Sequence, residues 1–151
     1  MKKSQRLQRI VELNANEEKS ALQALGEAHG KKKDLQKQLE DLQQYQQEYK
    51  EKLQSSSESG IKIKNLIEFK SFLSKLELVI EKHNKDILCL DQELGVLRKN
   101  WEKQHLKTKN LQNICDNAAR KERGIEDKKE QYEQDDHATR MGVANGIRNA
   151  K

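Results

Sequence analysis

The 151-residue sequence contains no proline, the residue that most strongly interrupts a helix. Aromatic residues make up 4% of the chain and hydrophobic residues 33%, which is too little to build a large compact core. No stretch approaches the ~20 consecutive apolar residues of a membrane span. The amino-terminal residues are polar from Lys2 onward, unlike a secretory signal peptide. These absences predict a protein that stays in the cytoplasm and does not insert into a membrane.

Cysteines and catalytic groupings are also scarce. Cys89 and Cys115 lie on one predicted helix, about 39 Å apart at ~1.5 Å per residue, so we expect two reduced thiols rather than a disulfide. The histidines are dispersed, and no histidine and carboxylate set has metal-ligand spacing. Neither a glycine-rich phosphate loop nor a nucleophile beside a base is present. The sequence therefore predicts no catalytic residue, no metal and no cofactor, and a protein that is not an enzyme.

The chain does contain a long apolar repeat with alternating steps of three and four residues, which is typical of a coiled coil. The repeat runs twice and is broken once, by the polar stretch 55–60. Before the break it reads Leu7, Val11, Asn14, Glu18, Ala21, Leu25, Ala28, Lys32, Leu35, Leu39, Leu42, Gln46, Tyr49, Leu53. After the break it reads Leu66, Phe69, Leu73, Leu76, Ile80, His83, Ile87, Leu90, Leu94, Leu97, Trp101, Gln104, Thr108, Leu111, Cys115, Ala118, Glu122, Ile125, Lys129, Tyr132.

This pattern predicts an all-α fold, a long antiparallel two-stranded coiled-coil hairpin with unequal helices and a stalk-like form. We expect a helix over about 3–54, a turn over about 55–62 and a second helix over about 63–137. Together these would form a single hairpin domain over 1–138, followed by a flexible tail over 139–151. The interspersed charges, 36% of the residues, fit the solvated faces of such a hairpin.

An antiparallel register follows from matching the two repeats. With Leu25 opposite Leu97, small residues face large ones, for example Ala28 and Leu94, as dense packing requires. Polar repeat residues also meet, as Asn14 does with Thr108 and Glu18 with Gln104, which would penalise other registers.

The same register places Leu7 opposite Cys115, so the second helix overhangs the first. Beyond about residue 121 it would have no intramolecular partner, although Ile125 and Tyr132 continue the apolar repeat. An unpaired apolar stripe at a helix end is a candidate docking surface for another protein.

A second candidate surface lies beside the repeat. Residues with one shared spacing on each helix form a continuous patch when the helices pair, with Tyr49 beside Phe72 and Gln38 beside His83. The patch residues that do not belong to the coiled-coil repeat should be partly exposed, as in a binding hot spot. The alternative is that they only broaden the hairpin core. The patch consists of Gln38, Leu42, Tyr45, Tyr49, Phe72, Leu76, Val79 and His83.

At these residues the chain resembles the FliJ-type flagellar export proteins of the bacterial flagellar type III secretion apparatus. The resemblance covers nearly the whole chain, including its length, the stretches 42–49 and 66–83, and the single Trp101. It implies an antiparallel coiled coil resembling the stalk subunit of rotary ATPases, with both termini entering the centre of the export ATPase hexamer. It also implies binding to the cytoplasmic domain of the transmembrane export gate and to export chaperones.

The resemblance assigns these roles to residues of this chain. The gate-binding surface would be the patch defined above, in which Val79 departs from the smaller residue often found there. The ATPase-facing end would consist of Leu7, Ile10, Val11, Ile125 and Tyr132. A monomer is implied, cytoplasmic and peripherally associated with the inner membrane at the flagellar base.

Three other interpretations stay open at this point. The chain could be a structural or adaptor coiled coil that dimerises through its apolar repeat. It could be the equivalent stalk protein of a virulence type III secretion system. A nucleic-acid-binding arm is the third, but the basic clusters at Lys2, Lys3, Arg6 and 31–33 lack interleaved aromatic residues, so no nucleic acid is expected.

Overall fold

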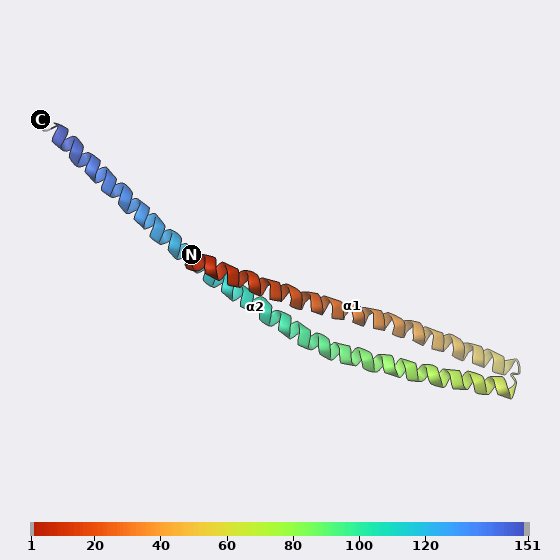
Figure 1. Cartoon of the computed structure of the whole chain (residues 1–151). Coiled ribbons are helices and arrows are strands. Elements are labelled where there is room, and N and C mark those ends of the chain that lie inside the picture. Colours follow the sequence, from red (N-terminus) through yellow and green to blue (C-terminus); the bar gives the residue numbers. More distant parts are fainter. Residues whose placement is uncertain (1, 150–151) are drawn as a thin grey trace. The chain divides into compact units, whose positions relative to one another are not determined.

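The computed structural model describes residues 2–149, with side chains through residue 143. It contains two helices, α1 (Lys3–Glu58) and α2 (Ile63–Asn149), and no strand within 2–149 (Figure 1). The helices pack against each other, so the predicted all-α hairpin is confirmed. Both helices run without a break because no proline interrupts them and their apolar repeats can be buried along one stripe.

The connection between the helices is shorter than the turn over about 55–62 that the sequence predicts, because α1 ends at Glu58 and α2 begins at Ile63. Ser59 ends α1 by donating from its backbone N and its Oγ to the carbonyl oxygen of Ser55, at 3.1 and 2.6 Å. Gly60 then adopts a left-handed φ of 82°, which glycine tolerates best and which commonly ends a helix. The expected end of the first helix near residue 54 is therefore wrong, because residues 55–58 continue α1. Serine costs little helix stability at such positions.

The end of α2 also differs from expectation. The helix was expected to stop near residue 137, but its backbone continues to Asn149, so residues 139–149 of the expected tail are helical. Residues 150–151 lie outside the described part of the chain. This stretch contains two glycines, Gly142 and Gly146. Each lowers helix stability by only ~1 kcal/mol relative to alanine, and no proline is present to stop the helix.

The hairpin divides into two compact units. The turn unit comprises Glu18–Lys103, and the terminal unit comprises Met1–Glu17 with Gln104–Lys151. In the turn unit the core is a cluster of buried leucines and an alanine, with Leu35, Leu97 and Trp101 packed against it, and the buried members are Leu25, Ala28, Leu90 and Leu94. The predicted partners Ala28 and Leu94 both belong to this cluster, and so do Leu25 and Leu97.

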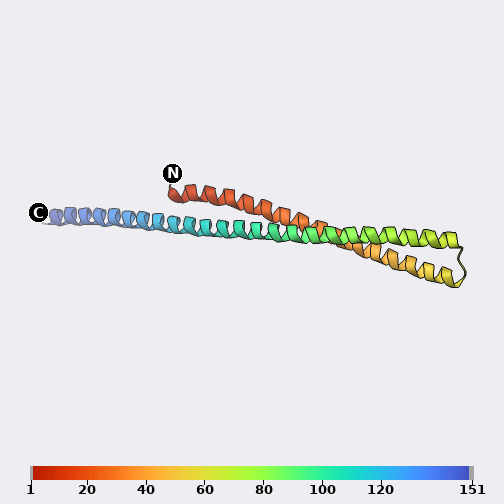
Figure 2. The same ribbon diagram turned by 90° about the horizontal axis from the view of Figure 1, so that it is seen from below.

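A charged residue within the apolar repeat of the turn unit forms an ion pair with a residue of the other helix. The Nζ of Lys32 forms an ion pair with the Oδ1 of Asp91, and the lysine side chain is 28% exposed. Figure 2 shows the ribbons of α1 and α2 crossing in this unit, whereas they run side by side in Figure 1, as expected for helices that wind about each other.

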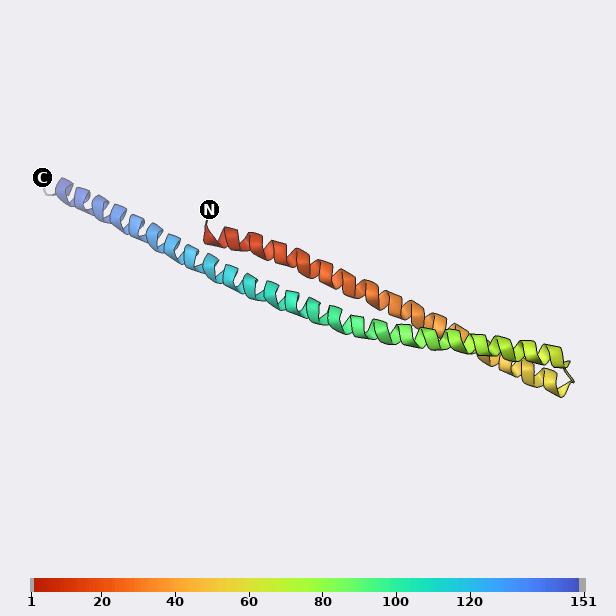
Figure 3. The same ribbon diagram turned by 60° about the horizontal axis from the view of Figure 1, so that its bottom comes forward.

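In the terminal unit the buried residues come from both helices. Val11, Asn14 and Cys115 are 5%, 6% and 4% exposed. The Sγ of Cys115 lies 3.4 Å from the carbonyl oxygen of Ser4 and 3.3 Å from the Oε1 of Gln8. These contacts place Cys115 opposite the turn that contains Leu7, as the register predicts. Within this unit, α2 continues past the start of α1 (Figure 3).

Cys89 and Cys115 are both free thiols. Across residues 2–149, neither helix has a stretch apolar enough to cross a bilayer.

Candidate functional site

Four aromatic side chains gather in the turn unit, close to the connection between the helices. The ring centroids of Tyr49 and Phe72 are 4.4 Å apart, which confirms that these residues are neighbours across the hairpin. Tyr45 lies 5.2 Å from Tyr49 and 6.0 Å from Phe72, where the rings meet edge to face. Phe69 completes the cluster at 5.6 Å from Tyr49. Such pairs stabilise a surface and give it a defined shape.

The patch predicted beside the repeat, called the lateral surface from here on, is divided between exposed and packed side chains. Tyr45, Phe72 and Val79 are 45%, 36% and 43% exposed, which confirms that residues outside the repeat reach solvent. Leu76 is buried at 7%. Leu42, Tyr49 and His83 are half-buried, and Gln38 is exposed. The lateral surface is thus an apolar face anchored in the hairpin, with accessible aromatic rings.

A hydrogen bond joins the two helices at the far end of the lateral surface. The Nε2 of His83 lies 3.3 Å from the Oε1 of Gln38, and its Nδ1 lies 3.2 Å from the carbonyl oxygen of Val79. Both oxygens can only accept, so a neutral ring donates from Nδ1 to Val79 or from Nε2 to Gln38, according to which nitrogen carries the proton. The predicted neighbours Gln38 and His83 are therefore in contact across the hairpin.

The rim of the lateral surface is polar. Lys52 Nζ lies 5.8 Å from the ring centroid of Tyr49, within cation–π range. The pKa of Tyr45 is raised, mainly by the nearby Tyr49 and to a smaller extent by partial burial and by the carboxylate of Glu48. The Tyr45 hydroxyl therefore stays protonated. A shallow groove of about 280 Å³ opens beside the rings and is lined by Tyr49, Asn65, Glu68, Phe69 and Phe72. An apolar surface with a polar rim is the usual anatomy of a protein interface.

Phe69 belongs to the second apolar repeat and was not among the residues predicted for the lateral surface. Its half-buried ring lies 5.6 Å from that of Tyr49 and lines the groove. The spacing of Phe69 and Phe72, three residues apart on one helix, was the available signal.

The residues assigned to the ATPase-facing end all lie in the terminal unit, but they differ in accessibility. Ile10, Ile125 and Tyr132 are 47%, 69% and 76% exposed. Leu7 is half-buried, and Val11, at 5% exposed, lies within the hairpin. Only the exposed residues can contact a partner directly, and Val11 can act only by holding α1 against α2.

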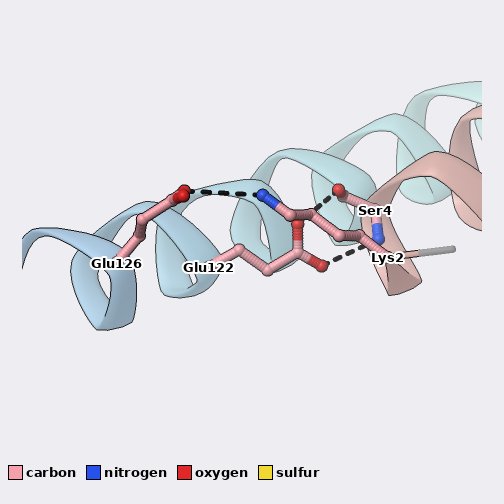
Figure 4. A network of polar contacts seen from close by, with 4 residues as sticks. All are labelled: Lys2, Ser4, Glu122 and Glu126. Atoms are coloured by element: carbon pink, nitrogen blue, oxygen red, sulfur yellow. Dashed lines mark hydrogen bonds and ion pairs between the residues drawn. The ribbon is translucent and has the colours of Figure 1, made fainter. Parts of the chain in front are cut away.

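The start of α1 is fastened to α2 by polar contacts (Figure 4). Glu122 accepts a hydrogen bond from the backbone N of Ser4 at 3.0 Å and another from its Oγ, and Lys2 Nζ lies 3.4 Å from Glu126 Oε2. The Ser4 hydrogen bonds lower the pKa of Glu122, with a smaller contribution from Lys2. The expectation that everything past about residue 121 lacks an intramolecular partner is therefore wrong, because pairing extends to Glu126.

Beyond Glu126, α2 continues as a projecting segment, residues 127–149. Among its side chains through residue 143, none forms a hydrogen bond or ion pair with α1. Across the described residues, no group of three histidine, cysteine or acidic side chains is arranged to hold a metal ion.

Comparison with known proteins gives these surfaces a context. The model of the family described as flagellar FliJ protein matches residues 2–146. Over 137 residues the chain is 25% identical to the flagellar FliJ protein of Salmonella typhi, an alignment that covers 91% of this chain and 93% of that protein. No solved structure matches the chain significantly. The chain therefore belongs to the flagellar FliJ protein family, whose members are non-catalytic components of the flagellar export apparatus.

Proposed function

We propose that the chain is a non-enzymatic, stalk-like coupler of flagellar protein export. Its terminal unit binds the export ATPase hexamer, and its lateral surface binds the cytoplasmic domain of the transmembrane export gate. Export chaperones are further partners. The observation that carries this proposal is the lateral surface, on which aromatic rings of both helices lie exposed in a chain with few aromatic residues.

The lateral surface has the properties of a binding hot spot. Its exposed rings lie against buried or half-buried neighbours, so they are held in place before a partner arrives. Preorganised aromatic side chains lose little conformational entropy on binding and contribute a large contact area. The apolar core and polar rim suit a protein partner better than a small ligand, since the adjacent groove is shallow and open.

The proposed ATPase-facing surface consists of Ile10, Ile125 and Tyr132, with Leu7 and Val11 as packing support. These apolar side chains are exposed near the start of α1 and on the part of α2 that extends past it, where a partner's groove could accept them. We place the protein in the cytoplasm as a monomer, peripherally associated with the inner membrane at the flagellar base through its gate contact.

The gate contact can be tested with the double variant Tyr45→Ala and Phe72→Ala. We expect its affinity for the purified cytoplasmic domain of the gate to fall by about 30- to 700-fold, since two hot-spot aromatic residues that each contribute on the order of 1–2 kcal/mol together contribute about 2–4 kcal/mol. Calorimetry would measure the affinity, and circular dichroism should show unchanged helix content. Equal affinity of the double variant and the unmodified protein would disprove the assignment of the lateral surface.

A matched control is the variant Leu78→Ala and Leu88→Ala. These leucines are 65% and 63% exposed on α2 of the same turn unit but lie outside the lateral surface. Gate affinity should be unchanged in this control. A loss similar to that of the aromatic variant would indicate a nonspecific effect of removing exposed apolar area.

A further inference from the structure

A second groove, in the terminal unit, is separate from the lateral surface. It has a volume of about 420 Å³ and lies where the start of α1 meets α2. Ile114 and Ile125, 51% and 69% exposed, supply apolar surface that neither helix covers. The groove is lined by Lys3, Ile114, Asn117, Ala118, Lys121, Glu122 and Ile125.

The groove lies in a positively charged part of the terminal unit. Lys107, Ile114, Lys121 and Lys128 recur every seventh residue, so they follow one line along the surface of α2. Lys3 adds a cation from α1 on the groove wall. None of these lysines is in an ion pair with a described side chain.

The single carboxylate of the groove offsets only part of this charge. Glu122 points toward Ser4 and accepts hydrogen bonds from its N and Oγ, as Figure 4 shows. It remains negatively charged, so the lining holds two lysines against one carboxylate. A ligand in the groove would meet apolar side chains bordered by Lys3 and Lys121, which form no ion pair with a described side chain.

We propose that this groove binds an acidic amphipathic helix of a partner protein, with leucine or phenylalanine anchors between Ile114 and Ile125 and carboxylates beside Lys3 and Lys121. A helix fits because the groove follows α2 and no strand edge is available for pairing within 2–149. The groove shares Ile125 with the proposed ATPase-facing surface, but the helix is held between Ile114, Lys3 and Lys121, which the proposed function does not use. Binding of an isolated peptide tests it without the ATPase, so the two proposals can fail separately.

Two other kinds of partner fit the groove less well. Anionic membranes also attract lysine beside apolar residues, but a helix that lies on a bilayer needs a long continuous apolar face, which this short groove does not supply. Single-stranded nucleic acid needs aromatic side chains on which bases can stack, and none lines the groove.

The probe is a fluorescent peptide of about 18 residues, long enough to form a helix, with leucines on one face and glutamates beside them. Its binding to the full chain is followed by fluorescence anisotropy at low salt. We expect Ile114→Ser and Lys121→Glu each to weaken binding by about tenfold or more, because one removes an anchor contact and the other reverses a charge.

Matched controls come from the same helix and the same unit. Leu106→Ser removes a leucine that is 58% exposed, and Lys109→Glu reverses a charge, both outside the groove. Peptide affinity should not change in either. The proposal is overturned if these controls weaken binding as much as the groove variants do, or if a scrambled peptide binds equally well.

Two further outcomes would also overturn the proposal. One is the absence of peptide binding at low salt. The other is binding to vesicles of phosphatidylcholine and phosphatidylserine that depends on Lys121 while the peptide does not bind, since this would assign the groove to a lipid surface. Circular dichroism of every variant confirms that the helices are intact, which the high exposure of Ile114 leads us to expect.

Discussion

At the scale of single residues, the most informative contact is the one between Glu122 and Ser4. The first turn of α1 contains no acidic residue of its own to stabilise the amide groups that a helix start leaves unpaired. Glu122 supplies the carboxylate from the other helix and accepts the backbone N–H of Ser4 at 3.0 Å. A residue far away in sequence thereby performs the role of a helix cap.

The first prediction concerns the variant Glu122→Gln. We expect faster amide hydrogen exchange over residues 4–8 and unchanged exchange in the turn unit, because the charge-assisted hydrogen bonds to Ser4 are weakened. Glu130→Gln, an exposed acidic position on the projecting segment, should have no effect. Identical exchange at residues 4–8 in both variants would show that Glu122 does not fasten α1.

The same contact should respond to pH. The pKa of Glu122 is lowered from its ordinary value of 4.5 in the folded protein, so its stabilisation is complete above pH 4.5 and is lost as the pH falls through the lowered folded value. The protection factor at residues 4–8 in the unmodified protein, which compares the exchange rate with the intrinsic rate at the same pH, should therefore fall on acidification. In Glu122→Gln this acid-induced change should be absent.

At the scale of helices, each element depends on one narrow buried stripe. In the turn unit α2 contributes Leu90 and Leu94, 8% and 4% exposed, which pack with Leu25 and Ala28 of α1. Among the side chains of residues 2–143, none is both large and fully buried, so stability comes from many partly buried contacts along the stripe. The elements therefore depend on each other for stability more than on their own helix propensity.

We predict that Leu94→Ala destabilises the protein by about 2–3 kcal/mol, near the lower end for buried leucine because the elongated stripe can partly relax. Val96→Ala is the matched control, since Val96 is 68% exposed on the same helix and should change stability by less than about 0.5 kcal/mol. Urea titration followed by circular dichroism measures both. Similar losses in the two variants would contradict the helix pairing described here.

At the scale of the whole molecule, the two proposed binding surfaces lie on different units. The turn unit holds the lateral surface, and the terminal unit holds the exposed Ile10, Ile125 and Tyr132. The proposed coupler would need separate surfaces for separate partners, and this distribution is consistent with that proposal. A structural coiled coil that dimerises through its apolar repeat would need that repeat to be free, whereas here Val11, Leu76 and Leu94 are covered within one chain.

The prediction at this scale uses a chain truncated after Glu126. It keeps the contacts of Ser4 and Lys2 with α2 but lacks Tyr132 and the rest of the projecting segment. Titrated into the cognate export ATPase, the full chain should stimulate ATP hydrolysis, and the truncated chain should need on the order of tenfold higher concentration or fail to do so.

The point variant Tyr132→Ser separates loss of this side chain from loss of the segment, and it should also reduce stimulation. Sedimentation at low micromolar concentration should show a monomer in every case. Full stimulation by the truncated chain would exclude the projecting segment as the ATPase contact. A persistent dimer would favour the structural alternative.

Much of this protein could be predicted from its sequence because helical periodicity is a local property. The two helices, the break between them, the pairing of Tyr49 with Phe72 and the exposure of Tyr45 all follow from spacing and register. The ends of the helices were predicted less accurately from the sequence. Serine and glycine only weaken a helix, and the residue at which it ends depends on the hydrogen bonds that form there.

The sequence by itself determined that this chain is a hairpin of two long helices, because an apolar repeat without proline has no better way to be buried. Only the tertiary structure decided which side chains remain available on it. Val11 is covered, Phe69 joins the aromatic cluster, and Glu122 turns to the start of α1. These outcomes depend on side-chain directions across the helix pair, and a repeat in one dimension does not specify them.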